Sequence, residues 1–234
     1  MAGTRVTPFD REFWISLSET QPSSRFKWYQ TAIMALGALN YPEEIPNVYN
    51  LLLEKYIPKE SQFQETQKIR EGLTKLCGIM GAAKTGTSLR QLAAATPSEL
   101  VDPTYHRESD TREKALERGQ RMLSMIYGKI PDYEGSGTLS AGPDYYHIAR
   151  ELLYGYIFSF DAILDIPETQ QVIVSALLGI DCPEQARNHM LGFLMNGGQQ
   201  EDLVFIRDIV SRIAERGGVH LRRVAKFETP KLNL

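Results

Sequence analysis

Two stretches of the sequence lie over each other without a gap: NYPEEIPNVYNLL at residues 40–52 and DCPEQARNHMLGF at residues 181–193. The offset between them is 141 residues, as from Pro42 to Pro183. In each stretch an Asn or Asp supplies a capping oxygen, a proline follows where its missing N–H is not needed, and a glutamate meets the positive end of the helix dipole. The block therefore predicts the same helix start in two copies of one unit.

Flanking segments extend the match in the same order. Residues 35–36 match residues 176–177, and IREGLTKL at 69–76 matches IRDIVSRI at 206–213 with an offset of 137 residues. A loop between the blocks can absorb the change in offset. The alternative is that any two amphipathic helices with proline starts look alike. Three aligned blocks in one order favour an internal repeat of a helical unit.

Helical rather than alternating periodicity runs through most of the chain. The β-branched run at 172–178 follows Pro167 and Glu168, which favours a helix over a strand. We therefore predict an all-α fold. The predicted helices are Arg25–Leu39, Glu43–Tyr56, Glu65–Gly81, Thr87–Ala95, Asp110–Tyr127, Asp144–Phe158, Glu168–Leu178, Pro183–Met195 and Gln200–Glu215.

Two polar segments separate these helices. Lys129–Pro143 is rich in glycine, serine and proline and predicts a loop. Thr96–Asp110 is polar and predicts the joint between the two halves. We expect an N-terminal extension, a degenerate first repeat, a linker, a second repeat and a tail. Their expected bounds are 1–24, 25–96, 97–111, 112–216 and 217–234.

The helix after Pro183 carries one apolar face, which we expect to be buried. Gly197 and Gly198 then predict its end. His189 lies on the apolar face, where the first copy has Val48. The face is formed by Ala186, His189, Met190, Phe193 and Leu194.

Composition restricts the classes of function. Hydrophobic residues make up 42% and charged residues 24% of the chain, which is ordinary for a globular protein. The formal net charge of −3 offers no basic stripe, so nucleic acid is not expected as a partner. No apolar run is long enough for a membrane span, and no secretory signal core is present, so we expect no membrane association.

The two cysteines, Cys77 and Cys182, form neither a CxxC pair nor a metal-ligand cluster. We expect free thiols in a reducing compartment, no metal and no cofactor. The tripeptide at 232–234, Leu-Asn-Leu, does not match the peroxisomal address. We expect the cytoplasm, with the mitochondrial matrix as the alternative, because acidic residues near the N-terminus disfavour a transit peptide without excluding it.

The run ETQQVIVSALLGIDCPEQARNHMLGFLMNGGQQEDLVFIRDI, from Glu168 to Ile209, resembles the signature region of the carboxymuconolactone decarboxylase-like family, part of the AhpD-like superfamily. The family's histidine position falls on His189, and its Asn-Gly-small joint falls on residues 196–198. Tyr154 and the following glycine resemble the family's Tyr/Phe-Gly position. The resemblance implies an AhpD-like helical fold made of two degenerate repeats of this kind.

Two departures restrict the chemistry that the resemblance implies. Peroxidase members use a CxxC pair, because a thiolate and a resolving thiol are both needed. Cys77 is followed by GIMGAAK, without a second cysteine, so peroxidase activity is not expected. The segment SFDAILDIPE at 159–168 lacks the arginines that bacterial decarboxylases place there, so carboxymuconolactone itself is not the expected substrate.

By resemblance, His189 is the candidate catalytic proton donor, because an imidazole can exchange a proton near neutral pH. The other candidates are Glu168 as a catalytic acid and, for substrate binding, Tyr154, Glu71, Lys75 and Asn196. Each role has a structural alternative. A core histidine, a glutamate at a helix start, ordinary packing of Tyr154 and an i,i+4 ion pair between Glu71 and Lys75 are all common.

The expected function is that of a cofactor-independent decarboxylase or lyase acting on a small organic acid or enolic molecule. The alternative is a catalytically silent, oligomeric binding or scaffold protein. We expect a homo-oligomer, dimer or trimer, because each unit must cover its apolar faces. The expected interface contains Trp28, Tyr29, Met34 and Leu51–Leu53. The alternative is a monomer whose loop and tail cover these faces.

Overall fold

The computed structural model describes residues 8–23, 25–128, 130 and 136–231, and this part of the chain consists of helices and their connecting segments, without a strand. The all-α prediction is confirmed. The α-helices are α1 (Arg11–Ser18), α2 (Trp28–Leu39), α3 (Ile45–Leu51), α4 (Gln62–Lys75), α5 (Cys77–Ala95), α6 (Arg112–Tyr127), α7 (Ser136–Ala141), α8 (Pro143–Ile148), α9 (Ile166–Gly179), α10 (Pro183–Met195) and α11 (Gln200–Arg216). Short 3₁₀ turns are η1 (Pro42–Glu44), η3 (Lys59–Ser61), η4 (Ser98–Leu100) and η6 (Val224–Lys226), and π-helical segments are η2 (Leu52–Tyr56) and η5 (Ala149–Phe158).

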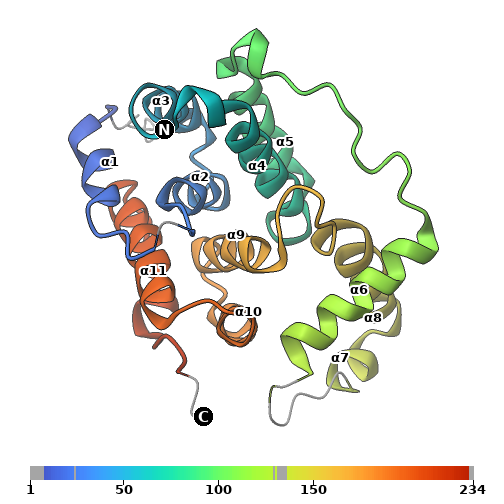
Figure 1. Cartoon of the computed structure of the whole chain (residues 1–234). Coiled ribbons are helices and arrows are strands. Elements are labelled where there is room, and N and C mark those ends of the chain that lie inside the picture. The colour runs from blue at the N-terminus through green and yellow to red at the C-terminus, as the bar shows by residue number, and fades with distance from the viewer. Residues whose placement is uncertain (1–7, 24, 129, 131–135, 232–234) are drawn as a thin grey trace, which may run out of the picture.

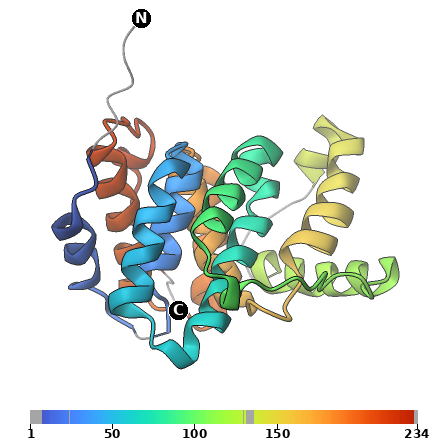
Figure 2. The same cartoon turned by 90° about the horizontal axis from the view of Figure 1, so that it is seen from above.

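Helices α2 and α9 pack against each other in the centre of the molecule (Figure 1). Helix α11 packs on both of them, α4 and α5 cover α2, and α10 lies between α9 and α6. The group α6–η5 forms one end of the molecule, and α1 with α11 forms the opposite end (Figure 2). All residues of α2 are buried, so this helix packs on every side rather than on one amphipathic face.

A small polar cluster fixes the contact between the two central helices. Gln171 Nε2 donates to Thr31 Oγ1 at 3.1 Å, and Ser175 Oγ donates to the same oxygen at 3.2 Å. These side chains are buried, and their hydrogen bonds offset the cost of removing them from water. Closer to the helix ends, a Cβ on Gly179 would lie 2.8 Å from that of Ala38, so the backbones approach closely. The register of α2 on α9 is therefore specified.

Helices α2 and α9 end in the same kind of turn. Asn40 and Asp181 adopt φ values of 68° and 58°, the left-handed region that ends many helices. The next residue donates back over the turn, from Tyr41 N to the carbonyl of residue 36 at 2.8 Å and from Cys182 N to that of residue 177 at 2.9 Å. The predicted N-capping by Asn40 and Asp181 is wrong. They close the preceding helix, and no side chain caps the start of η1 or α10.

The predicted helices differ from the structure where a kink or a π turn intervenes. The expected helix Glu65–Gly81 is two helices, because α4 ends at Lys75 and α5 begins at Cys77. Gly81, with φ of 80°, kinks α5 rather than ending it. The loop predicted at Lys129–Pro143 contains α7, while residues 129 and 131–135 lie outside the described residues. The helices predicted to end at 56 and 158 end in π-helical turns.

The side chains expected at an oligomer interface lie inside this chain. Helix α2 is covered on all sides, and Leu51 and Leu52 of the next helices are also buried, so they are unavailable to a second copy. The tail packs at the turn after α9, since Leu221 and Val224 are buried and the Asp181 carboxylate accepts from the N–H groups of Arg223 and Val224. The interface prediction is therefore wrong in these residues: Trp28, Tyr29, Met34, Leu51 and Leu52. Within the described ranges, no helix combines the length and apolar character needed to cross a bilayer.

Candidate active site

The predicted apolar face of α10 is buried and carries one polar side chain, His189. Ala186, Met190 and Phe193 are buried around it, and the helix ends at Met195, followed by Gly197 with φ of 96°. His189 is 3% exposed. The helical spacing in the sequence therefore predicted the placement of this residue correctly, and its neighbours decide what it can do.

Three polar side chains contact the His189 imidazole. Nδ1 lies 2.8 Å from Gln170 Oε1, and Nε2 lies 3.4 Å from the hydroxyl oxygens of both Tyr127 and Tyr154. An amide oxygen only accepts hydrogen bonds, so Nδ1 carries the proton and Nε2 presents its lone pair to the tyrosines. His189 is thus bonded to side chains and not to a backbone carbonyl.

Burial lowers the pKa of His189 to about 4. The imidazole is therefore neutral near pH 7, because the charged form is disfavoured away from water. A neutral imidazole with a protonated Nδ1 accepts a proton at Nε2 and has none to give there. The role expected for His189, a proton donor, does not fit this state; an acceptor does.

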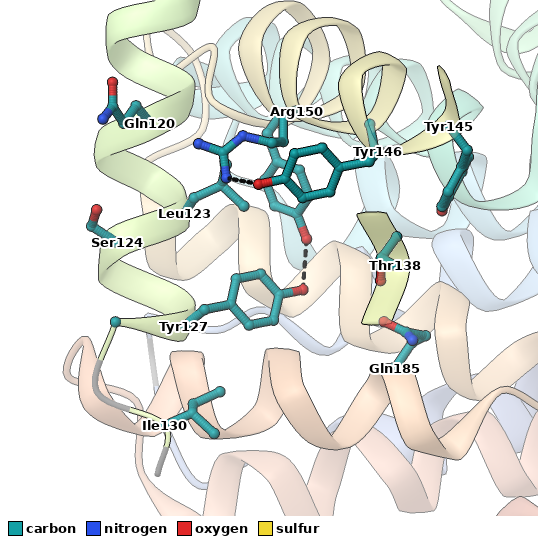
Figure 3. Close-up of a pocket in the computed structure, with 13 residues that line it drawn as sticks. Gln120, Leu123, Ser124, Tyr127, Ile130, Thr138, Tyr145, Tyr146, Arg150 and Gln185 are labelled. Atoms are coloured by element: carbon teal, nitrogen blue, oxygen red, sulfur yellow. Dashed lines mark hydrogen bonds between the residues drawn. The ribbon is translucent and has the colours of Figure 1, made fainter. Parts of the chain in front are cut away.

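The tyrosine hydroxyls connect His189 to a pocket of about 560 Å³. Tyr127 and Tyr154 line it, and their hydroxyl oxygens lie 2.7 Å apart (Figure 3). His189 itself does not line the pocket, so it lies behind the hydroxyl pair. The other lining residues are Gln120, Leu123, Ser124, Gly128, Ile130, Thr138, Tyr145, Tyr146, Ala149, Arg150 and Gln185.

Arg150 is the one charged residue among the described residues that line this pocket. Its Nη1 donates to Tyr146 Oη at 3.1 Å, and its guanidinium lies 5.2 Å from the centre of that ring (Figure 3). A guanidinium held against a ring presents its free N–H groups in a plane, which suits a carboxylate. The pocket therefore combines one cation, one pair of hydroxyls and aromatic walls.

A close contact between two glycines sets the distance between the tyrosines. A Cβ on Gly119 of α6 would lie 2.7 Å from the Cα of Gly155 in η5, so neither helix can approach this way with a larger residue at 119. Tyr127 follows on α6, and Tyr154 directly precedes Gly155. The Tyr-Gly pair that the resemblance singled out thus has a packing reason, because Gly155 brings Tyr154 to Tyr127.

The predicted acid, Glu168, contacts other groups than His189. Its carboxylate accepts from the Asp165 N–H at 3.0 Å, in a capping box that starts α9, and from the Lys68 ammonium. It is Gln170, two residues further along the buried helix, that contacts His189. The structural alternative for Glu168, a charge at a helix start, accounts for the capping box, and the ion pair with Lys68 joins α9 to α4.

Glu71 and Lys75 lie in a separate buried cluster of charges at the end of η5. Lys75 is 0% exposed, and its Nζ donates to the carbonyl oxygens of Phe158 at 2.6 Å and Phe160 at 2.5 Å. Burial lowers its pKa to about 7, and Glu71, 3.7 Å away, opposes that shift. The expected substrate-binding role does not fit a fully enclosed ammonium that is already bonded to carbonyls.

Two arginines complete this cluster, which we term the cation clamp: Lys75, Arg107 and Arg118. Arg107 donates to both oxygens of Glu71 and to the carbonyl of Tyr156, while Arg118 donates to Asp110 and to the carbonyl of Ser159. The clamp binds carbonyls at the C-terminal end of η5, where the helix dipole favours positive charge. It therefore fixes the segment that carries Tyr154 onto α4.

Asn196, the remaining predicted residue, also serves the framework. Its side-chain N–H group donates to the carbonyl oxygens of Met125 at 3.0 Å and Gly192 at 2.7 Å. It thereby ties the end of α10 to α6, two residues before Tyr127. Asn196 does not line the pocket.

Of the predicted site residues, only His189 and Tyr154 meet at the pocket, while Glu71 and Lys75 meet in the separate charged cluster. Gln170, Tyr127 and Arg150 were missed. The sequence could have indicated Tyr127, since it ends a predicted helix just before Gly128. It could also have indicated Arg150, which lies one turn before Tyr154. No sequence feature indicated Gln170, because α9 is buried on every side from Thr169 on.

Over the described residues, no three His, Cys, Asp or Glu side chains are grouped to hold a metal. Cys77 and Cys182 are free, as predicted, and burial raises the pKa of the half-buried Cys77 thiol.

Comparison with known proteins finds relatives in two yeasts. The chain is 27% identical over 194 residues to the protein named peroxisomal protein 2 of Schizosaccharomyces pombe, covering 83% of this chain and 88% of the relative. It is 25% identical over 264 aligned positions to the protein of the same name from Saccharomyces cerevisiae, covering 88% of this chain and 93% of the relative. No family model matches the chain, and no solved structure matches it. The family resemblance therefore stays a prediction.

Proposed function

We propose that the chain is a cofactor-independent enzyme of the decarboxylase or lyase type, similar to the carboxymuconolactone decarboxylase-like family, and that it acts on a small organic acid in the Tyr127–Tyr154 pocket. One observation carries this proposal. Two hydroxyls join a buried, neutral His189 to a pocket whose one cation, among the described lining residues, is Arg150. A titratable group behind a pocket with convergent polar groups is characteristic of a proton-transfer site.

The residues divide the chemistry between them. Arg150 pairs with a carboxylate of the ligand, and the aromatic walls accept its apolar part. One hydroxyl donates to His189 Nε2, and the other donates to the first across 2.7 Å and turns its proton to the ligand when a ligand is bound. When the bond to the carboxyl carbon breaks and CO₂ leaves, the electron pair stays on the neighbouring carbon, and the tyrosine proton moves to that carbon. Solvent at the pocket mouth then returns a proton to the phenolate.

The second candidate function is binding without turnover. The observation that favours it is the burial of His189, which does not touch the pocket directly. A buried histidine bonded to Gln170 and two tyrosines also satisfies the polar groups of an ordinary core. The two functions share the pocket and differ in whether a bound acid is converted.

A ligand screen with product detection tests both functions. Small carboxylic acids and phenolics that bind the native state raise the melting temperature, and each such ligand is then incubated with the protein and followed by NMR for loss of CO₂. We expect Arg150→Gln to weaken binding about tenfold, as expected for a lost charge-assisted pair, and Tyr154→Phe to abolish turnover. Tyr56→Phe is the matched control, since that hydroxyl contacts only Ser18 in the described structure. Binding without product would support the second function, and a screen with no ligand sensitive to Arg150→Gln would contradict both.

The name of the relatives favours a peroxisome-related location for this chain over the cytoplasm expected from composition. Imaging of the tagged chain beside a peroxisomal marker tests this part of the proposal. A homo-oligomer also remains part of it, with an interface other than the buried residues named above. Light scattering at micromolar concentration tests it, and the mass of a single chain would contradict it.

A further inference from the structure

A second hollow, of about 210 Å³, lies between α4 and the segment 102–107 that joins the two halves. Gln67, Arg70 and Thr74 recur at helical spacing and present one face of α4 to it. The opposite wall comes from Asp102–Arg107, with Ile163 at the side. No residue of this hollow lines the Tyr127–Tyr154 pocket, and none has a part in the chemistry proposed above.

A buried aspartate holds a histidine at the edge of this hollow. The Asp102 side chain is 4% exposed and accepts from Gln67 Nε2 at 2.6 Å, from the Thr104 N–H at 2.9 Å and from His106 Nε2 at 2.6 Å. Burial acts to raise the pKa of Asp102, but these hydrogen bonds outweigh it and lower the pKa well below its ordinary range. The carboxylate is ionised, so His106 donates through Nε2 and directs Nδ1 away from it. The His106 side chain is 30% exposed.

The accessible charge in the hollow is positive. Arg70 Nη1 donates to the Asp102 backbone carbonyl at 2.7 Å, and among the described residues no carboxylate forms an ion pair with Arg70. The neighbouring Arg107, by contrast, is paired with Glu71. Both carboxylates near the hollow, Glu71 and Asp102, are buried and already occupied by donors. A ligand that enters therefore meets the unpaired charge of Arg70 and no accessible negative charge.

We propose that this hollow is a second binding site, for a small oxyanion of the carboxylate or phosphate type. Arg70 pairs with the anionic oxygens, because a guanidinium with unused N–H groups matches their geometry. His106, held by Asp102, lines the hollow and provides a further hydrogen-bonding group for the ligand. The volume restricts the ligand to a compact molecule.

Histidine-ring NMR of the full chain at constant pH and ionic strength tests the proposal, with the His106 signals assigned through His106→Gln. The probes are sodium phosphate and sodium acetate, with sodium chloride as the ionic control. We expect a saturable shift of the His106 signals with phosphate, acetate or both. The proposal is overturned if neither probe gives saturation or if chloride gives the same shift.

Variants separate this site from other causes. Arg70→Gln should weaken the response about tenfold, as for a lost charge-assisted pair. Arg90→Gln is the matched control, because Arg90 lies exposed on α5 and contacts only Thr87 in the described structure. Tyr154→Phe should leave the response unchanged, so failure of the proposed pocket chemistry does not decide this test. A response that survives in Arg70→Gln would contradict the proposal, and calorimetry on His106→Gln gives a second measurement should Arg70→Gln fail to fold. A response confined to phosphate points to phosphate esters, and one confined to acetate points to carboxylic acids.

Discussion

Two helix-turn-helix regions, residues 28–51 and 166–195, share a turn and differ in what they bury beside it. Both close the first helix with a left-handed non-glycine residue and start the next with proline. In the first region Val48 is sealed in the apolar core. In the second, the matching position is His189, bonded to Gln170 and two tyrosines. The comparison shows that the same backbone turn can be followed by either an apolar or a polar buried side chain.

The helices that follow show the opposite difference. On α4, Glu71 and Lys75 are buried, at 4% and 0% exposure. On α11, the matching pair Asp208 and Arg212 is 52% and 32% exposed, with the charges 3.7 Å apart. The buried ion pair thus lies on α4 and the buried histidine on α10. The cation clamp, which includes Lys75 of α4, holds the segment that carries Tyr154, so the pocket depends on α4 as well as on the helices that line it.

The largest expected effect concerns the two ion pairs. Lys75→Met should reduce the free energy of unfolding by about 3 kcal/mol, because it removes the donor to buried carbonyls and one partner of a buried pair. Arg212→Met, the matched change on α11, should cost about 1 kcal/mol or less, since exposed pairs contribute little. Urea unfolding of both variants measures the difference. Equal losses would mean that the two pairs are equivalent despite their burial.

The next effect is the pH dependence that His189 gives to the second region alone. Its folded-state pKa, about 4, lies below the unfolded value of 6.5, so folding favours the neutral form. Its contribution to the free energy of unfolding is complete above pH 6.5 and declines as the pH falls. Below pH 4 it is lost, and the total loss is about 3 kcal/mol. The stability of the wild type should therefore fall over this window more steeply than that of His189→Val. Parallel pH profiles for the two proteins would rule out a depressed pKa.

Exchanging the side chains at positions 48 and 189 should reduce the free energy of unfolding by a smaller amount. His189→Val leaves the Gln170 amide oxygen buried without a donor, and we expect a loss of about 2 kcal/mol. Adding Gln170→Leu removes the unpaired amide and should restore most of that loss. Val48→His places an imidazole in an apolar site and should destabilise by a similar amount, about 2 kcal/mol. Thermal unfolding at pH 7 measures all three variants, and a neutral Val48→His would show that the first region has polar partners to offer.

The smallest effect concerns the shared turn. Asn40→Gly should change stability by only a few tenths of a kcal/mol, because glycine adopts the left-handed conformation without strain. Asp181→Gly relieves the same conformation but also removes the carboxylate that accepts from the N–H groups of Arg223 and Val224, so we expect a loss of about 1 kcal/mol. Urea unfolding resolves the two. Identical values would mean that the tail contact contributes nothing to stability.

Sequence pattern predicted the helical class and the burial of His189, because proline, glycine and the spacing of apolar side chains act locally. It placed Asn40 at the wrong helix, since a side chain that can cap the next helix can also adopt the left-handed turn that ends the previous one. Sequence pattern did not predict that Gln170 contacts His189, because a helix buried on all sides has no polar face that indicates its orientation. The spacing of Glu71 and Lys75 equals that of Asp208 and Arg212, so burial of one pair depends on tertiary packing alone.

The π-helical segment η5 makes the pocket sensitive to the number of residues in the chain. A π turn holds one residue more per hydrogen-bonded ring than an α turn, and single-residue insertions into α-helices produce such turns. Deleting one residue between Arg150 and Tyr154 would let η5 relax towards an α-helix while rotating the two side chains relative to each other by roughly 100°. A relative with a one-residue gap here would keep the fold and separate the cation from the hydroxyl pair. The length of this segment therefore matters more for the geometry of the pocket than the types of its residues.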